Sequence, residues 1–447
     1  MTDAPEAPEP ITTQNAQAAL DAHGTNPWKL PDFRLLWVGR LAAVLAIQTQ
    51  GAALLWQVYD IARRDHPIEE ASLYLGLIGL CQFLPLMALT LPAGEMADRL
   101  DRKRTVALSI CVEGLCAVLF LAMALHGSPP LWGLLAVAAL FGGARAFLAP
   151  ASQAFLPMVV GRAALPRAIA AQSIAFQTGS IAAPALAGLI VGVAVPYAYA
   201  TALALFGVGL FCFLMIRASG KPDREQTPFS PKAMFDAVGV GLRYVWNTKV
   251  VLGAISLDLV VVLLAGVALL TPIFARDIFH IGAEGFGLLR ASFGAGALLM
   301  AGWLARFPIV RRAGVWMFGA VALFGLAALT FGVSGWAAMR LHLTDAAGVA
   351  WIAGAALFTA GAADMISVNI RQTLIQLATP DEMRGRVSSV SMLFIGASNE
   401  LGEFYTGFAV RILGPLMAAL FGGAAALASV GLWSWMFPGL RKADRLS

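Results

Sequence analysis

The sequence predicts an all-α integral membrane protein with twelve transmembrane helices in two six-helix pseudosymmetric bundles. Three observations support this fold class: the composition, the recurrence of long apolar runs, and a resemblance between the two halves. The 447 residues are 59% hydrophobic and 13% charged, with a mean hydropathy of +0.75, which is outside the usual range of soluble domains. Apolar runs of about 20 residues can each cross a hydrocarbon core of roughly 30 Å as a helix.

The runs divide into two sets of six. The first bundle, 34–217, holds spans at 35–60, 71–97, 105–126, 131–155, 168–194 and 196–217. The second bundle, 250–437, holds spans at 250–275, 283–306, 313–335, 347–376, 386–412 and 414–437. Because these runs lack the alternation of barrel strands, we expect helices throughout. Residues 1–33 are predicted to be a disordered cytoplasmic tail, without the basic start and apolar core of a signal peptide, and 438–447 a second tail.

A polar stretch, 218–249, joins the two bundles and is predicted to be a cytoplasmic linker. Its second half places Met234, Val238, Leu242 and Val245 three or four residues apart. This spacing indicates an amphipathic helix, which we expect to lie along the membrane surface.

The distribution of positive charge predicts the topology. Most of the 31 Lys and Arg residues fall in the tails, the linker and alternate loops, which by the positive-inside rule assigns both termini to the cytoplasm. We therefore expect a multi-pass protein of the cell inner membrane. The net charge of +5 reflects this topology and does not indicate a nucleic-acid partner.

The two halves contain matching segments. Gln153 matches Gln372 and Arg167 matches Arg386 with one shared offset. With a different offset, GEMADRLDRKR at 94–104 has a degenerate counterpart at 302–312. Parallel repeats of this kind occur in secondary transporters, in which a site between the two halves opens alternately to each side. The repeat therefore favours a carrier.

The segment 94–104 reads G-x-x-x-D-R-x-x-R-K-R and lies between the second and third spans. It resembles the loop signature of the major facilitator superfamily, although Asp101 stands where that family usually has a small residue. The resemblance implies that the loop holds the inner side shut in the outward-facing state. The predicted gating residues are Gly94, Asp98, Arg99, Arg102, Lys103 and Arg104.

Residue chemistry suggests how this loop could act. Gly94 would allow close helix contact, and the Asp98 carboxylate could cap a neighbouring helix or pair with an Arg at the cytoplasmic rim. The alternative is that the loop only anchors the topology and does not switch.

The fifth span contains GSIAAPALAG, from Gly179 through Pro184 to Gly188. It resembles an exporter motif of the superfamily, with Ala183 and Ala187 in place of two glycines, and ordinary small-residue packing is the alternative. Segments 142–160 and 370–404 resemble the enterobactin-exporter-like branch, which includes siderophore and proton-driven multidrug exporters. The resemblance implies efflux and antiport without fixing the substrate.

Ionisable side chains within the spans are functional candidates, because each costs about 2.5–3.5 kcal/mol to insert. Arg145 and Asp364 occupy equivalent repeat positions and are predicted to face one cavity. Glu400 and Glu403 share a helix face, where like charges favour sharing a proton. Asp364 or this Glu pair is the hypothetical proton carrier, and structural ion pairing is the alternative. The remaining candidates are Arg40, Glu113, Asp258 and Arg290.

No pattern indicates an enzyme, a phosphate-binding loop or a metal site. Cys81, Cys111, Cys116 and Cys212 lie within predicted spans without ligand spacing, so neither a metal nor a disulfide is expected. We expect no cofactor, the proton gradient as the energy source, a small-molecule substrate and a functional monomer. A lipid translocator, an importer and a non-transporting receptor remain alternatives on this fold.

Overall fold

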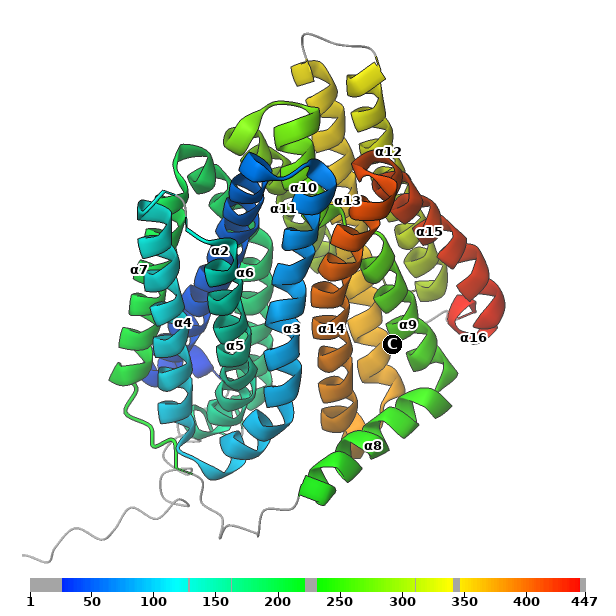
Figure 1. Ribbon diagram of the computed structural model, residues 1–447. Coiled ribbons are helices and arrows are strands. Elements are labelled where there is room, and N and C mark those ends of the chain that lie inside the picture. Colours follow the sequence, from blue (N-terminus) through cyan, green and yellow to red (C-terminus); the bar gives the residue numbers. More distant parts are fainter. Residues whose placement is uncertain are drawn as a thin grey trace, which may run out of the picture.

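The computed structural model describes residues 26–127, 129–161, 163–221, 231–309, 311–340 and 346–442. Most of the first predicted tail, half of the second and part of the linker lie outside these ranges. Helices dominate the described residues, and they group into two bundles that lie side by side (Figure 1).

The first bundle begins with a short 3-10 helix, η1 (Pro27–Lys29), and is built from six long helices. These are α2 (Pro31–Asp65), α3 (Ile68–Arg99), α4 (Arg102–Leu125), α5 (Leu131–Val159), α6 (Leu165–Val193) and α7 (Val195–Met215). A proline stands in the first turn of α2, α6 and α7, where its missing N–H is not needed and its fixed φ favours helix initiation.

The second bundle repeats the arrangement with one interruption. It comprises α9 (Lys249–Leu264), α10 (Val267–Ile273), the π-helical turn η2 (Phe274–Ile278), α11 (Gly282–Arg306), α12 (Ala313–Arg340), α13 (Ala346–Ala378), α14 (Asp381–Leu413) and α15 (Pro415–Met436). The predicted span 250–275 is therefore broken at Ala265 and Gly266. A Cβ on Gly266 would lie 2.3 Å from the Thr406 hydroxyl oxygen, so the break allows close approach of α14.

The number of spans agrees with the predicted twelve. Among the described residues, ten helical segments are long and apolar enough to cross a membrane, with α9 to η2 counted as one. The helices α6 and α14 lie alongside them in the two bundles and complete the twelve (Figure 1). The charged residues of α14 lower its hydropathy, and two of them, Glu400 and Glu403, belong to the candidate site.

The linker carries the expected helix, α8 (Pro231–Asn247), which crosses below the second bundle in Figure 1. Val245 is buried in a small cluster with residues of α9, α13 and α14, whereas Leu242 is exposed. The Tyr244 hydroxyl donates a 2.5 Å hydrogen bond to the Ala378 carbonyl oxygen. The side chains of Met234 and Val238 lie outside the described set, so that part of the predicted stripe stays a prediction.

Residues 438–441 of the predicted second tail form a short helix, α16 (Pro438–Arg441). Leu440 is fully buried, and a Cβ on Gly314, at the start of α12, would lie 2.1 Å from its carbonyl oxygen. This part of the segment is packed against the second bundle, because an apolar side chain gains from burial there.

The bundles meet mainly through α3 against α14 and α6 against α11. We call the end that carries α8 the linker end, and the opposite end the remote end. In the remote halves of these helices, a Cβ on Gly188 would lie 2.5 Å from the Gly287 Cα, and one on Gly407 would lie 2.9 Å from the Gly76 Cα. Only glycine allows backbones to approach this closely.

At the linker end, glycines of the same helices make no such close contact with a described atom. No described atom lies within 4 Å of a Cβ built on Gly94 of α3, Gly302 of α11 or Gly396 of α14. The close helix contact predicted for Gly94 therefore stays a prediction. The close backbone contacts between the bundles lie at the remote end.

Packing between α3 and α5 predicts a stability effect. A Cβ on Gly142 of α5 would lie 2.3 Å from the Gln82 backbone oxygen, so Gly142→Ala forces the two helices apart. We expect a loss of about 1–3 kcal/mol and a lower Tm for the detergent-purified protein.

The matched control is Gly207→Ala on α7, where no described atom lies within 4 Å of the new Cβ. It should leave Tm unchanged or raise it slightly, since alanine favours helix. Equal Tm values for the two variants would contradict the assigned α3–α5 packing.

Candidate functional site between the two bundles

One ion pair crosses between the bundles near the middle of their helices. The Arg145 guanidinium of α5 donates a 2.8 Å hydrogen bond to the Glu400 carboxylate of α14 and a 3.1 Å bond to the Gln82 side-chain oxygen of α3. The Glu400 side chain is 9% exposed and that of Arg145 27%. The Arg145 guanidinium also lies 5.7 Å from the centre of the Phe141 ring. A carboxylate of one bundle is thus bound by a cation of the other.

Glu403 adds a second carboxylate to the same surface of α14. A Cβ on Gly79 of α3 would lie 2.4 Å from the Glu400 backbone oxygen and 2.9 Å from the Glu403 Cβ, so α3 passes directly over this pair. Glu403 interacts electrostatically with Glu400, Arg145 and Arg290. The predicted shared face of the two glutamates is therefore turned towards the first bundle.

Two further charges of the first bundle are linked to Arg145, Glu113 directly and Arg40 through Glu113. Glu113 of α4 is fully buried, and neither carboxylate oxygen has a hydrogen-bond partner among the described residues. It interacts electrostatically with Arg145 and with Arg40 of α2. Arg290 of α11 lies 5.7 Å from the centre of the Phe286 ring on the other side of the interface. We call these six residues the central network: Arg40, Glu113, Arg145, Arg290, Glu400 and Glu403.

Two predicted candidates lie outside the central network. Asp258 of α9 forms a buried ion pair with Arg371 of α13, entirely within the second bundle. Asp364 of α13 forms no ion pair with a described residue. Arg145 pairs with Glu400 in this conformation, because α3 and α14 cross here; that Arg145 and Asp364 face one cavity stays a prediction.

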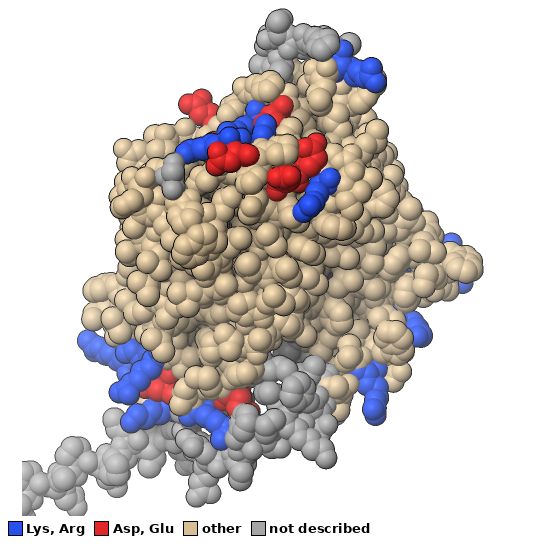
Figure 2. All heavy atoms as spheres, viewed as in Figure 1, with Lys and Arg blue, Asp and Glu red and all other residues tan. Residues whose placement is uncertain are grey.

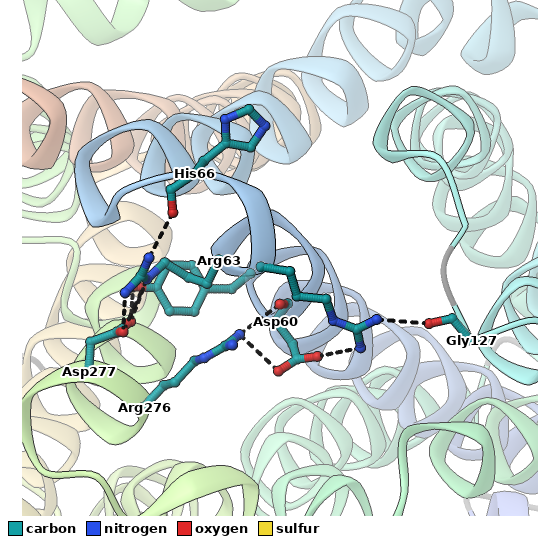
Figure 3. A network of polar contacts seen from close by, with 8 residues as sticks. Asp60, Arg63, His66, Gly127, Arg276 and Asp277 are labelled. Atoms are coloured by element: carbon teal, nitrogen blue, oxygen red, sulfur yellow. Dashed lines mark hydrogen bonds and ion pairs between the residues drawn. The ribbon is translucent and has the colours of Figure 1, made fainter.

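A second ionic network joins the bundles at the remote end (Figure 3). The Arg63 guanidinium lies 2.7 Å from the Asp277 carboxylate, and the Tyr59 hydroxyl donates a 2.5 Å hydrogen bond to the same group. Arg276 lies 2.8 Å from the Asp60 carboxylate and also donates to the Asp60 carbonyl oxygen at 2.7 Å. Because α2 supplies one partner of each pair and η2 the other, both pairs hold the bundles together.

Neighbouring groups fix the arginines of α2 in this remote network. Arg63 donates to the His66 carbonyl oxygen at 2.7 Å, while Arg64 donates to the Gly127 carbonyl oxygen at 3.1 Å and to Asp60 at 3.0 Å. Sequence analysis missed this network, because charges at helix ends are usually solvated. The available signal was the D-x-x-R-R spacing at the end of the first span, together with adjacent opposite charges at the end of the seventh.

The loop signature at 99–104 makes its described contacts within the first bundle. Asp101 accepts a hydrogen bond from the Arg104 N–H and caps α4, a role that was proposed for Asp98. The Lys103 ammonium donates to the Leu214 and Ile216 carbonyl oxygens at the end of α7, where a cation complements the helix dipole. The Asp98 side chain lies outside the described set, so its role stays a prediction.

Two other signature residues have local partners. Arg99 pairs with Glu95 one turn earlier at 2.5 Å, and Arg102 donates from its backbone to the Gly220 carbonyl oxygen. These contacts fix the turn between α3 and α4 to the chain that follows α7. Asp101, which stands where the family usually has a small residue, therefore caps α4 in this turn.

The exporter-like segment lies in α6 and makes contacts both within the first bundle and between the two bundles. A Cβ on Gly179 would lie 2.6 Å from a Val44 methyl carbon of α2, within the first bundle, whereas Gly188 meets Gly287 across the interface. The Pro184 side chain lies outside the described set. Among the described residues, the structure holds no cluster of three potential metal ligands, and all four cysteines are free thiols.

Comparison with known proteins identifies the family. The profile of the major facilitator superfamily matches residues 36–402. The chain belongs to the major facilitator superfamily. It is therefore a multi-pass membrane transporter and not an enzyme, as predicted.

Named relatives within the superfamily are enterobactin exporters. The chain is 27% identical to the enterobactin exporter EntS of Citrobacter koseri over 424 residues, covering 88% of this chain and 92% of the relative. It is also 27% identical to EntS of Escherichia coli over 415 residues, covering 89% and 88%. The resemblance to the enterobactin-exporter-like branch is thus confirmed at the level of sequence similarity.

Solved structures share the fold at low sequence identity. An auto-inhibited POT family peptide transporter aligns with a TM-score of 0.64 and 13% identity, covering 90% of this chain and 96% of that protein. A D-xylose–proton symporter aligns with a TM-score of 0.63 and 12% identity, covering 91% and 97%. These likenesses confirm the major facilitator fold of the two bundles.

The remote network predicts how a charge substitution changes closure. Asp277→Asn weakens the bonds from Arg63 and Tyr59. The contact between the two bundles therefore loses about 1–3 kcal/mol of stabilisation. The remote end should open more often. A cysteine placed at Ser72, which is buried beside Gly407 of α14, should then react with a polar thiol reagent about ten times faster, in a background without the four native cysteines.

Glu69→Gln is the matched control, because Glu69 is an exposed carboxylate at the same end without an ion pair to a described residue. In Glu69→Gln, the cysteine at position 72 should react at the same rate as in the parent protein. If Asp277→Asn also left the rate at position 72 unchanged, the network would not hold the remote end closed.

Proposed function

We propose that this superfamily member is a proton-coupled exporter of a small amphipathic organic molecule, a siderophore or a drug, and that it works as a monomer by alternating access. The observation that carries the proposal is the Arg145–Glu400 ion pair, which crosses between the bundles. We propose that this pair breaks when the remote end opens. Similarity to EntS over most of the chain supports export and a siderophore-type substrate. The exporter-like segment at 179–188 supports the same direction.

The charge distribution supports an orientation. Lys and Arg residues gather at the linker end in Figure 2, below a broad band of uncharged surface. By the positive-inside rule we assign this end to the cytoplasm. Contacts between α3 and α14 and between α6 and α11 then close the periplasmic side, and the conformation is inward-facing. Substrate would enter from the cytoplasm and leave when the remote end opens.

Opening to the outside requires three sets of contacts to separate. These are the glycine contacts of the remote halves, the two ion pairs between α2 and η2, and the Arg145–Glu400 pair. The first two are short-range contacts that reform after each cycle. The third lies among apolar helices, where separating two charges is costly unless one is neutralised.

Protonation of the glutamate pair supplies that neutralisation. A proton on Glu400 removes the charge that holds Arg145, while Glu113 of the first bundle is close enough to stabilise the freed guanidinium electrostatically. Glu403, one turn away, can exchange the proton with Glu400. We propose that this pair carries the proton and that the gradient supplies the energy without a cofactor. Asp364 is the alternative carrier.

The signature loop has its proposed role in the opposite state. In this conformation no described atom lies within 4 Å of a Cβ built on Gly94. We propose that the residues of 94–104 contact the second bundle when the cytoplasmic side closes. Asp98 is the residue placed to make that contact.

Substrate class is tested by accumulation in efflux-deficient cells that express the protein. A panel of catecholate siderophores, cationic dyes and antibiotics is measured with and without a protonophore. We expect at least one compound to accumulate less in expressing cells, with accumulation restored by the protonophore. Unchanged accumulation of every compound, with membrane expression confirmed, would contradict export of these classes.

The proton carrier is tested with the exported compound in proteoliposomes. Glu400→Gln keeps the size of the side chain but not its titratable charge, so proton-driven transport should fall by about ten-fold or more, since each 1.4 kcal/mol of coupling is a factor of ten. Exchange without a gradient should continue. Glu403→Gln and Asp364→Asn are measured beside it, with Glu69→Gln as the control.

If only Asp364→Asn lost proton coupling, the proton carrier would be Asp364 and not the glutamate pair. Full gradient-driven transport in Glu400→Gln and Glu403→Gln would overturn the role of the glutamate pair. Export itself would be unaffected by either result.

A further inference from the structure

A pocket of about 430 Å³ lies at the remote end of the first bundle, away from the central network. The end of α2, the start of α3 and the start of α5 form its walls. Its volume lies within the range of sites for small organic molecules. Lining side chains include Ile61, Arg64, Asp65, Tyr74, Trp132 and Leu135.

Two opposite charges stand next to each other on this wall. Arg64 donates to Asp60 and to the Gly127 carbonyl oxygen, and its side chain is still 47% exposed. Asp65 is exposed and forms no ion pair with a residue of the described ranges. A guanidinium can bind a phosphate through several N–H groups, and a carboxylate can accept hydrogen bonds from an ammonium. The wall is thus complementary to a ligand carrying both charges.

The rest of the pocket is apolar and aromatic. Trp132, at the start of α5, is 74% exposed, and Tyr74 and Leu135 line the same pocket. Trp and Tyr are typical of the level at which lipid headgroups meet the hydrocarbon. Figure 2 shows charged side chains of both signs along the remote rim, directly above uncharged surface. The pocket therefore spans the boundary between headgroups and acyl chains.

We propose that this pocket binds a phospholipid whose headgroup carries both a phosphate and a primary ammonium. Arg64 binds the phosphate, Asp65 accepts hydrogen bonds from the ammonium, and an acyl chain passes along Trp132 and Leu135. A choline headgroup fits less well because its quaternary ammonium has no N–H to donate. A glycerol headgroup fits less well because it offers no positive charge to Asp65.

The site is connected to the closure of the remote end. Arg64 and Arg276 bind the same Asp60 carboxylate. A phosphate bound by Arg64 therefore shares a cation with Asp60 of the remote network. The inference does not depend on the direction or substrate of transport, and it can fail while the proposed export stands.

The test is lipid retention by the full-length protein. The protein is reconstituted in bilayers with equal parts of phosphatidylethanolamine, phosphatidylcholine and phosphatidylglycerol, extracted in mild detergent, and its bound lipids are measured by native mass spectrometry. We expect the ethanolamine lipid to be enriched about five-fold over the choline lipid, which is the effect of one additional charge contact near the membrane surface.

Asp65→Asn should remove this enrichment, because the headgroup loses its ammonium partner. Trp132→Ala should lower retention of all three lipids. Trp336→Ala is the matched control, since Trp336 is an exposed tryptophan beside Arg340 at the remote end of the second bundle, and it should leave the ratio unchanged. Helical circular dichroism confirms that each variant is folded.

Three results would overturn the proposal: bound lipid in the bulk ratio for the parent protein, an unchanged ratio in Asp65→Asn, or preferential retention of phosphatidylglycerol. The last would assign the pocket to anionic headgroups held by Arg64 alone. Because no transport is measured, these results are independent of the export assay.

Discussion

The cost of separating charge inside a membrane is the constraint on which this structure depends. Arg145 and Glu400 come from different bundles. Each offsets the free-energy cost of burying the other's charge, but only while the bundles are in contact. Any motion that parts α3 from α14 must first provide another way to neutralise these groups. Glu113 lies close enough to stabilise the freed Arg145 guanidinium, and Glu403 lies close enough to Glu400 to share a proton with it. We therefore propose that the central network makes the conformational change sensitive to protons.

Small residues determine where the bundles can close. At the remote end, backbones approach through Gly188 and Gly287 and through Gly76 and Gly407, and the ion pairs between α2 and η2 lie at the same end. At the linker end no described atom lies within 4 Å of a Cβ built on Gly94. Close backbone contact at one end is what two nearly rigid bundles rocking about a central contact would produce.

The fold could be predicted from the sequence far better than the site. Apolar runs determine helix number, and the repeat determines the two bundles, because both depend on local composition.

The pairing of Arg145 could not be derived in this way. Pseudosymmetry places Asp364 opposite it, but symmetry relates positions within the bundles and does not fix which helices cross between them. The crossing of α3 and α14 brings Glu400 to Arg145. Similarly, Asp60 and Arg276 lie far apart in the sequence and meet only because α2 and η2 end side by side.

The central claim is that the Arg145–Glu400 pair couples charge to the rocking of the bundles. Spin-label distances between the bundles test it most directly, with one label pair at exposed positions 132 and 351 of the remote end and another at 100 and 307 of the linker end. In Glu400→Gln, the account predicts a longer distance at the remote end and a shorter one at the linker end than in the parent protein. Unchanged distances at both ends would contradict it.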